Sequence, residues 1–160
     1  MLKNSVTFEP KSNISAGCSI GNGKYILYKS GQKNGRLNTY TNEGIYIIAN
    51  DGGEASFKLT NDKFSYTDHC ICFKCESDEK TIVLANYLQF LEKKITHVGF
   101  IGTGLKNIDR QYLGMIKIPK FEYKKIAKSF CIIDKAVLGY EYKLDCLSKL
   151  KRQLLQTMFI

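Results

Sequence analysis

One short stretch of the sequence, from His69 to Cys75, combines residue types that bind metal ions. Zinc prefers a tetrahedral set of ligands, and Cys72 and Cys75 have the spacing of one ligand pair. The sequence contains no second pair, and alternation along a strand would place Cys70 and Cys72 on the same face. Small thiols packed in a β core explain this motif more simply than a zinc site does. We therefore expect no metal in this chain.

No other pattern in the sequence predicts catalysis. Neither His69 nor His97 stands in a recognisable triad, and a pair of catalytic carboxylates cannot be located from the sequence. Gly102 and Gly104 are too few for a dinucleotide fingerprint, and no glycine loop ends in the Lys-Ser or Lys-Thr of a phosphate-binding loop. We expect a non-catalytic protein without a cofactor of its own.

Two polar loops carry side chains suited to nucleic acid. In Gly102–Ile108 the glycines allow close approach of the backbone, Lys106 offers a phosphate contact and Asn107 offers an amide for a base edge. The loop Lys29–Arg36 is similarly rich in Lys, Asn, Gln and Arg. Each loop has an alternative interpretation, as a tight turn in the first case and as an ordinary hairpin tip in the second.

The charge of the chain favours a polyanionic partner. The 160 residues include 24 Lys and Arg against 15 Asp and Glu, which gives a net charge of +9. Lysine and arginine displace counterions from phosphates, although a merely solvated basic surface is the alternative and charge alone does not separate nucleic acid from an acidic membrane.

Hydropathy and cysteine content point to the cytoplasm. No apolar run approaches the ~20 residues that span a bilayer, and Met1–Pro10 lacks the apolar core of a signal peptide. We therefore expect no membrane partner and a cytoplasmic location. The 6 cysteines are expected to be free, buried thiols rather than disulfides.

The elements that must position these loops give an α+β fold, mostly β with short helices, followed by one long C-terminal coiled-coil helix. Two groups of turn residues, Asn50–Gly53 and Asn61-Asp62, separate apolar runs. The expected strands are Lys24–Tyr28, Gly44–Ala49, Ala55–Leu59, His69–Phe73, Val98–Ile101 and Met115–Ile118, with a helix over Glu79–Lys94 and a helical turn over Asp109–Leu113. Pro119 closes this domain, so the predicted division is 1–119 and 120–160.

The stretch from Tyr123 to Met158 predicts a single helix with a sustained apolar seam. Only Lys151 interrupts the seam, and a helix of this length would reach about 50 Å, beyond the width of so small a domain. The seam therefore predicts pairing with a second chain. Its residues are Ile126, Phe130, Ile133, Val137, Tyr140, Leu144, Leu147, Leu154 and Met158.

Three stretches together resemble the specificity subunits of type I restriction-modification systems. They are Gly23–Gly31 with Gly44–Gly53, the Gly102–Asp109 segment continued through Leu113 to Ile118-Pro119, and the closing helix with Leu150–Phe159. The resemblance implies one target-recognition domain followed by one spacer helix. Members of the family usually carry two of each, so it also implies pairing with a second copy or with a different half-subunit.

The resemblance further implies double-stranded DNA as a partner, read as one half of a bipartite target. A modification subunit would bring S-adenosylmethionine and the methyl-transfer chemistry, and a restriction subunit, whose presence the sequence leaves open, would use ATP. One departure from the family is Lys120–Lys124, where a proline-rich segment with a Glu-Gln pair usually precedes the helix. This departure affects how the start of the helix docks and how it contacts the modification subunit.

Side-chain chemistry assigns the expected roles. The residues expected to read bases are Gln32, Asn34, Arg36 and Asn107. The residues expected to contact phosphates are Lys29, Lys33 and Lys106. The expected DNA-contact set also includes Asn50, Gly52 and Gly53. Two other functions stay open: an assembly or adaptor protein that dimerises through the helix without binding DNA, and the recognition region of a fused methyltransferase.

Overall fold

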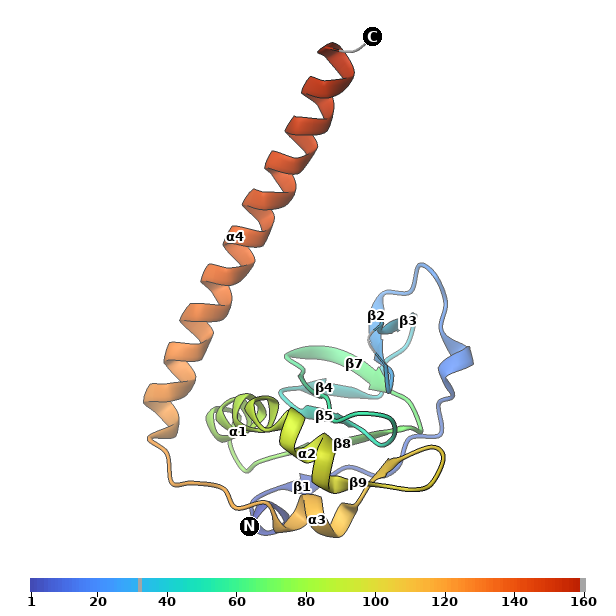
Figure 1. Ribbon diagram of the computed structural model, residues 1–160, viewed down its shortest axis with the longest axis vertical. Coiled ribbons are helices and arrows are strands. Elements are labelled where there is room, and N and C mark those ends of the chain that lie inside the picture. Colours follow the sequence, from blue (N-terminus) through green and yellow to red (C-terminus); the bar gives the residue numbers. More distant parts are fainter. Residues whose placement is uncertain (32, 159–160) are drawn as a thin grey trace.

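The computed structural model describes residues 1–31 and 33–158 of the chain. Within them, two four-stranded sheets pack against each other, short helices cover the outer face of one sheet, and a long helix leaves the domain (Figure 1). The expected α+β fold with a long C-terminal helix is confirmed.

The first sheet has the strand order β1-β8-β5-β6, all antiparallel. Its strands are β1 (Thr7–Phe8), β5 (Ile47–Asn50), β6 (Phe57–Leu59) and β8 (Cys70–Lys74). The second sheet has the order β3-β2-β7-β4, in which only β2 and β7 run parallel. Its strands are β2 (Tyr25–Tyr28), β3 (Gly35–Leu37), β4 (Asn42–Gly44) and β7 (Asp62–Tyr66). A separate ribbon pairs β9 (Phe100–Ile101) with β10 (Asn107–Ile108).

The central strands β5 and β8 are buried on both faces. On β5, Ile47 and Ala49 belong to the core beneath the helices, whereas Ile48 belongs to the core between the two sheets. Alternation along β8 likewise divides Ile71 and Phe73 from Cys70 and Cys72. Burial on both faces explains why these strands read as continuous apolar runs in the sequence.

The short helices cover the outer face of the first sheet. They are η1 (Leu2–Asn4), α1 (Asp78–Phe90), α2 (Glu92–Gly99) and α3 (Arg110–Met115). A further single-turn helix, η2 (Ala16–Cys18), has no buried residue and lies in the segment before β2. Helix α1 begins after Ser77, whose hydroxyl accepts a hydrogen bond from the Lys80 amide and so caps the helix. The prediction of one helix over Glu79–Lys94 is wrong, because the helix breaks at Leu91.

The break directs side chains of α1 and α2 to the edge of β6. Glu92 Oε1 accepts from the Phe57 amide at 2.7 Å, and Thr96 Oγ1 accepts from the Ala55 amide at 2.9 Å. Gln89 Nε2 donates to the Phe57 carbonyl at 2.8 Å. These contacts satisfy backbone groups that an open sheet edge would otherwise expose.

The strand predictions are incomplete, because β1, β3, β4 and β10 were not predicted and the predicted loop Lys29–Arg36 ends inside β3. Two further points need correction. Strand β7 was missed, because its first residue, Asp62, was read as part of a turn. The segment predicted as a strand over Met115–Ile118 instead ends α3 and continues without regular structure. Its Ile116 carbonyl accepts from the Leu2 amide at 2.9 Å, and its side chains pack on the helix-facing core, which accounts for the apolar run.

Helix α4 (Tyr123–Met158) leaves the domain after its first turns (Figure 1). Ala127 is its only buried residue in the described range, and it packs with Ile82 and Val83 of α1. Ile126 and Phe130 are partly buried on the same cluster. Over the residues described, no helix has the length and apolar character needed to cross a membrane.

Candidate nucleic-acid interface

Three turns far apart in the sequence meet at one end of the domain. The Gly53 amide donates to the Lys106 carbonyl at 2.9 Å, and the Ile108 amide donates to the Asp51 carbonyl at 2.9 Å. Ser30 Oγ of the β2–β3 hairpin donates to the Gly52 carbonyl at 3.3 Å. We call residues 29–31, 33–34, 50–53 and 102–108 the turn cluster. In Figure 1 it lies at the end of the domain opposite the start of α4.

Glycines allow these turns to approach one another. A Cβ on Gly52 would lie 3.0 Å from Asn107 Oδ1. Gly53 has φ +84° and Gly102 has φ +139°, both conformations that favour glycine. A Cβ on Gly102 would also stand 2.7 Å from the Leu105 carbonyl oxygen. The turn cluster therefore needs glycine at positions 52, 53 and 102 to keep this backbone conformation.

Lys58 connects the hairpin loop to the first sheet. Its ammonium donates to the carbonyls of Lys29 at 2.9 Å and Gly31 at 2.6 Å, and to Asn34 Oδ1 at 3.2 Å. Burial lowers the pKa of Lys58, and the nearby Cys70 opposes that shift. The three oxygens offset the cost of removing the ammonium from water.

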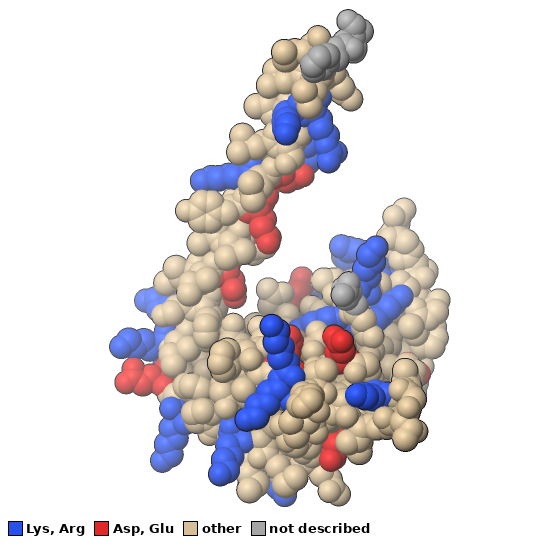
Figure 2. All heavy atoms as spheres, in the orientation of Figure 1, with Lys and Arg blue, Asp and Glu red and all other residues tan. Residues whose placement is uncertain are grey.

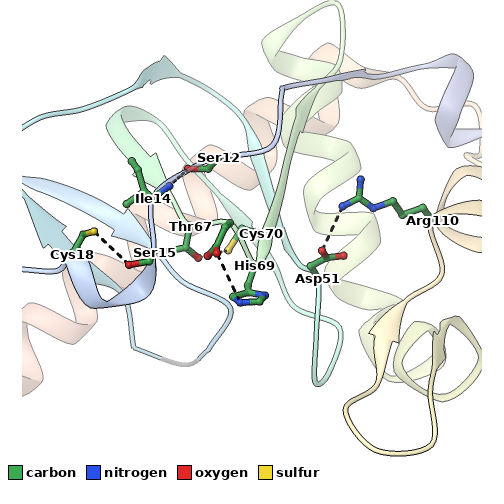
Figure 3. Close-up of polar contacts among 10 residues, drawn as sticks. Ser12, Ile14, Ser15, Cys18, Asp51, Thr67, His69, Cys70 and Arg110 are labelled. Carbon is green, nitrogen blue, oxygen red and sulfur yellow. Dashed lines mark hydrogen bonds and ion pairs between the residues drawn. The ribbon is translucent and has the colours of Figure 1, made fainter.

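An ion pair adjoins the turn cluster. Arg110, the first residue of α3, lies with Nη2 3.4 Å from Asp51 Oδ2, as Figure 3 shows. Asp51 is the one carboxylate within the described residues of the cluster. The pairing reduces the repulsion that this carboxylate would exert on a phosphate backbone, and most of the exposed guanidinium remains accessible to solvent.

Four of the expected contact residues are exposed on the turn cluster: Lys33, Asn34, Lys106 and Asn107. Gly52 and Gly53 lie at its centre, where their backbone pairs with the 102–108 loop. Lys29 is half-buried in the same loop, and its side chain crosses Gly35 so closely that a Cβ there would lie 2.6 Å from Lys29 Cε.

The structure places two other expected residues, Asn50 and Arg36, away from the exposed face of the turn cluster. Asn50 is only 8% exposed and its Nδ2 donates to the Glu54 carbonyl, so it closes the turn from inside. Arg36 Nη1 donates to the carbonyls of Gly23 at 3.3 Å and Lys24 at 3.5 Å, at the end of the hairpin away from its tip. Gln32 lies outside the described residues.

The cysteine motif is divided between interior and surface. Cys70, Cys72 and Cys75 are buried, which raises the pKa of each thiol. The His69 side chain is 70% exposed, and its Nε2 lies 4.0 Å from Asp68 Oδ2. Among residues 1–31 and 33–158, no three His, Cys, Asp or Glu side chains are placed to hold a metal ion. The expectation that all cysteines are buried is wrong, because Cys18, Cys131 and Cys146 are exposed.

Charge is distributed unevenly over the molecule. Figure 2 shows Lys and Arg side chains on both the domain and α4, and acidic side chains along the edge of α4 that faces the domain. Asp134, Glu141 and Asp145 continue the helix face of the buried Ala127, at intervals of whole turns. Acidic groups would repel a duplex from this edge.

The apolar seam of α4 is exposed beyond its first turns. Ile126 and Phe130, both expected in the seam, pack in part on α1 of their own chain. The remaining seam residues are 48% to 72% exposed. They are Ile133, Val137, Tyr140, Leu144, Leu147, Leu154 and Met158.

Sequence reasoning missed three residues that shape the turn cluster. Ser30 lay inside the predicted loop but was not assigned a role, and Arg110 directly follows the helix-capping residue Asp109. Lys58 stands between the apolar residues Phe57 and Leu59 in a predicted strand, and a lysine at such a position was the one sign in the sequence that its side chain has a specific partner. Its partners on another sheet could not be found from the sequence.

Comparison with known proteins shows a similarity in fold to a solved structure. No protein-family model matches the chain, and no curated protein sequence matches it. The crystal structure of a type I restriction-modification system S subunit from M. genitalium superposes with a TM-score of 0.72 over 86% of this chain, at 17% identity. The chain spans 39% of the length of that subunit. The likeness supports the α+β fold with its long terminal helix.

Proposed function

We propose that this chain is a DNA sequence-specificity subunit of a type I restriction-modification system. The observation that carries the proposal is the convergence of three separate turns into one exposed surface bearing Lys106, Asn107, Lys33 and Asn34. Ammonium groups suit phosphates, and amides suit base edges. Similarity in fold to an S subunit supports the same conclusion.

The proposed contacts divide by chemistry. Lys33 and Lys106 neutralise phosphates, with Lys29 behind them in the loop, while Asn34 and Asn107 read base edges in a groove. Arg110 adds a positive group beside the cluster. In this proposal the chain itself performs no reaction. The modification subunit supplies S-adenosylmethionine and methyl transfer, and a restriction subunit, where present, supplies ATP-dependent chemistry.

The exposed seam of α4 supports pairing with a second copy of the chain. Contiguous apolar surface of this length is costly in water, and a heptad seam is covered most simply by another helix. Two copies related by a twofold axis would present the same turn cluster to two half-sites. The target would then be bipartite, with a gap on the order of one duplex turn.

Salt dependence of binding tests the proposal. The purified chain is titrated onto a fluorescent mixed-sequence duplex at salt concentrations from about 50 to about 200 mM, and the slope of log affinity against log salt is measured. A DNA reader loses affinity steeply, with a slope of about −0.9 per phosphate contact. An unmeasurable affinity at the lowest salt would reject the proposal.

The exposed seam equally fits an adaptor protein that dimerises without DNA. Such a protein would pair through α4 and show no binding to the duplex at low salt. A recognition region of a fused methyltransferase is separated by a different measurement, because copurification with an independent catalytic subunit argues against it.

A further inference from the structure

Lys58 is a half-buried cation in direct contact with the loop that carries two of the proposed contacts, Lys33 and Asn34. It extends from β6 of the first sheet, whereas the loop that it contacts belongs to the β2–β3 hairpin of the second sheet. An ammonium has three N–H donors and no acceptor. The Lys29 carbonyl, the Gly31 carbonyl and Asn34 Oδ1 supply three oxygens within hydrogen-bond distance, at 2.9, 2.6 and 3.2 Å.

These bonds constrain both the backbone of the loop and the orientation of one side chain. The bonds from the ammonium to the Lys29 and Gly31 carbonyls hold the backbone of the loop. Asn34 is exposed, yet its carboxamide oxygen is held by the ammonium. An ammonium can only donate, so it selects the oxygen of the carboxamide and leaves the NH₂ group on the other branch.

We propose that Lys58 is a positioning residue for sequence recognition, which holds the Asn34 oxygen inward so that the chain presents an amide donor to the DNA. The inference rests on the proposed function and adds a residue that need not touch DNA. It also assigns a polarity to the contact made by Asn34.

That polarity has a consequence for base choice. In the major groove guanine, adenine and thymine each present an acceptor, whereas cytosine presents only its N4 amino donor. An amide donor held outward therefore discriminates against cytosine at the base that Asn34 faces. Once released from Lys58, the carboxamide can rotate about its last bond and accept a hydrogen bond from cytosine N4.

The test compares Lys58→Met with Lys63→Met, which removes the same charge from a half-buried lysine of β7 whose Nζ lies 3.9 Å from Glu43 Oε2. Amide exchange in the DNA-free protein is followed over residues 29–34, and base preference is measured by selection from randomised duplexes. For Lys58→Met we expect loop exchange to rise about tenfold without global unfolding, and discrimination against cytosine to fall by about tenfold at one position. The Lys63→Met control should change neither.

A second variant keeps the test valid if Lys58→Met unfolds the domain. Asn34→Ala removes the exposed amide and leaves Lys58 in place, and it should lose the same discrimination. The double variant should lose no more than either single variant, because Lys58 acts through Asn34. Additive losses would overturn the inference.

The remaining outcomes separate the inference from the proposed function. A wild-type chain that selects no sequence would overturn both. A selective wild type whose discrimination survives Lys58→Met would overturn the inference alone. A fall of about 0.9 in the salt slope, with affinity lost equally for all sequences, would also overturn it, because Lys58 would then be a phosphate contact.

Discussion

The turn cluster and the distal part of α4 are both exposed, but they present different groups to the solvent. The cluster carries ammonium and amide groups on a backbone fixed by hydrogen bonds among its turns. Helix α4 carries apolar side chains from Ile133 to Met158, most of them more than half exposed. Water can solvate the first surface until a ligand arrives, whereas the second favours permanent cover. The contrast agrees with the proposed function, in which DNA binds transiently at one end and a second helix covers α4 along its length.

The largest expected effect is on pairing of α4. Leu144→Lys with Leu147→Lys introduces two charges into the apolar seam and should convert the paired protein to a monomer. The melting temperature of the domain should stay the same, because both residues lie beyond the contacts of α4 with α1. Sedimentation measures the state of association. In the matched control, Gln153→Lys with Gln156→Lys adds the same charge outside the seam and should leave the protein paired, so equal behaviour of the two variants would exclude α4 as the interface.

The next effect concerns the backbone of the turn cluster. Gly102→Ala should cost about 1–3 kcal/mol of local stability, because φ is +139° and the new Cβ would lie 2.7 Å from the Leu105 carbonyl oxygen. DNA affinity should fall with it. Gly104→Ala is the control in the same loop, since no atom lies within 4 Å of its Cβ position. Thermal unfolding and duplex titration measure the two quantities, and similar losses in both variants would refute the constraint.

A smaller effect is expected for single contacts. Asn107→Ala should weaken preference at one base pair by about 1–3 kcal/mol, whereas Lys106→Ala should reduce affinity for all sequences and lower the salt slope by about 0.9. Competition between matched and mismatched duplexes measures the first, and a salt titration measures the second. A uniform loss from Asn107→Ala would assign it to the phosphate backbone.

Arg36→Ala sharpens the boundary of the cluster. Its guanidinium donates to the Gly23 and Lys24 carbonyls, so the variant should weaken the hairpin but leave base preference unchanged. Selection from a randomised duplex library measures that preference. Relaxed choice at one position would instead extend the reading surface along β3.

The smallest perturbation is a thiol titration, which compares the exposed cysteines of α4 with the buried cysteines of the domain core without mutation. Ellman's reagent should react with Cys18, Cys131 and Cys146 in the native protein, and with the three buried thiols only after unfolding. Burial raises the pKa of the buried thiols and also blocks access to them. Cys131 and Cys146 lie on the side of α4 away from the seam and should stay reactive after pairing. Protection of both would place the partner on the other face.

The sequence predicted α4 and five of the strands, β2, β5, β6, β8 and β9, because their signals are local. A heptad seam and alternating or continuous apolar runs require no knowledge of tertiary contacts, so β2, β6 and β8 were found within two residues. Strand β7 was missed because Asp62 resembles a turn residue, and the break at Leu91 depends on contacts of α2 with β6.

The candidate site was predicted in its parts but not in its assembly. Lysines and amides in glycine-containing loops drew attention to Lys106 and Asn107. The same reasoning selected Asn50, which is buried, and Arg36, which is held elsewhere, because exposure and hydrogen-bond partners depend on the fold. Lys58 was missed for the same reason.

The most direct measurement is selection of targets by the purified chain from a long randomised duplex, with and without the methyltransferase partner. The proposed twofold pairing of two turn clusters predicts two identical half-sites, inverted and separated by a constant gap of unread base pairs. A single contiguous half-site in the selected pool, or no sequence preference, would contradict it.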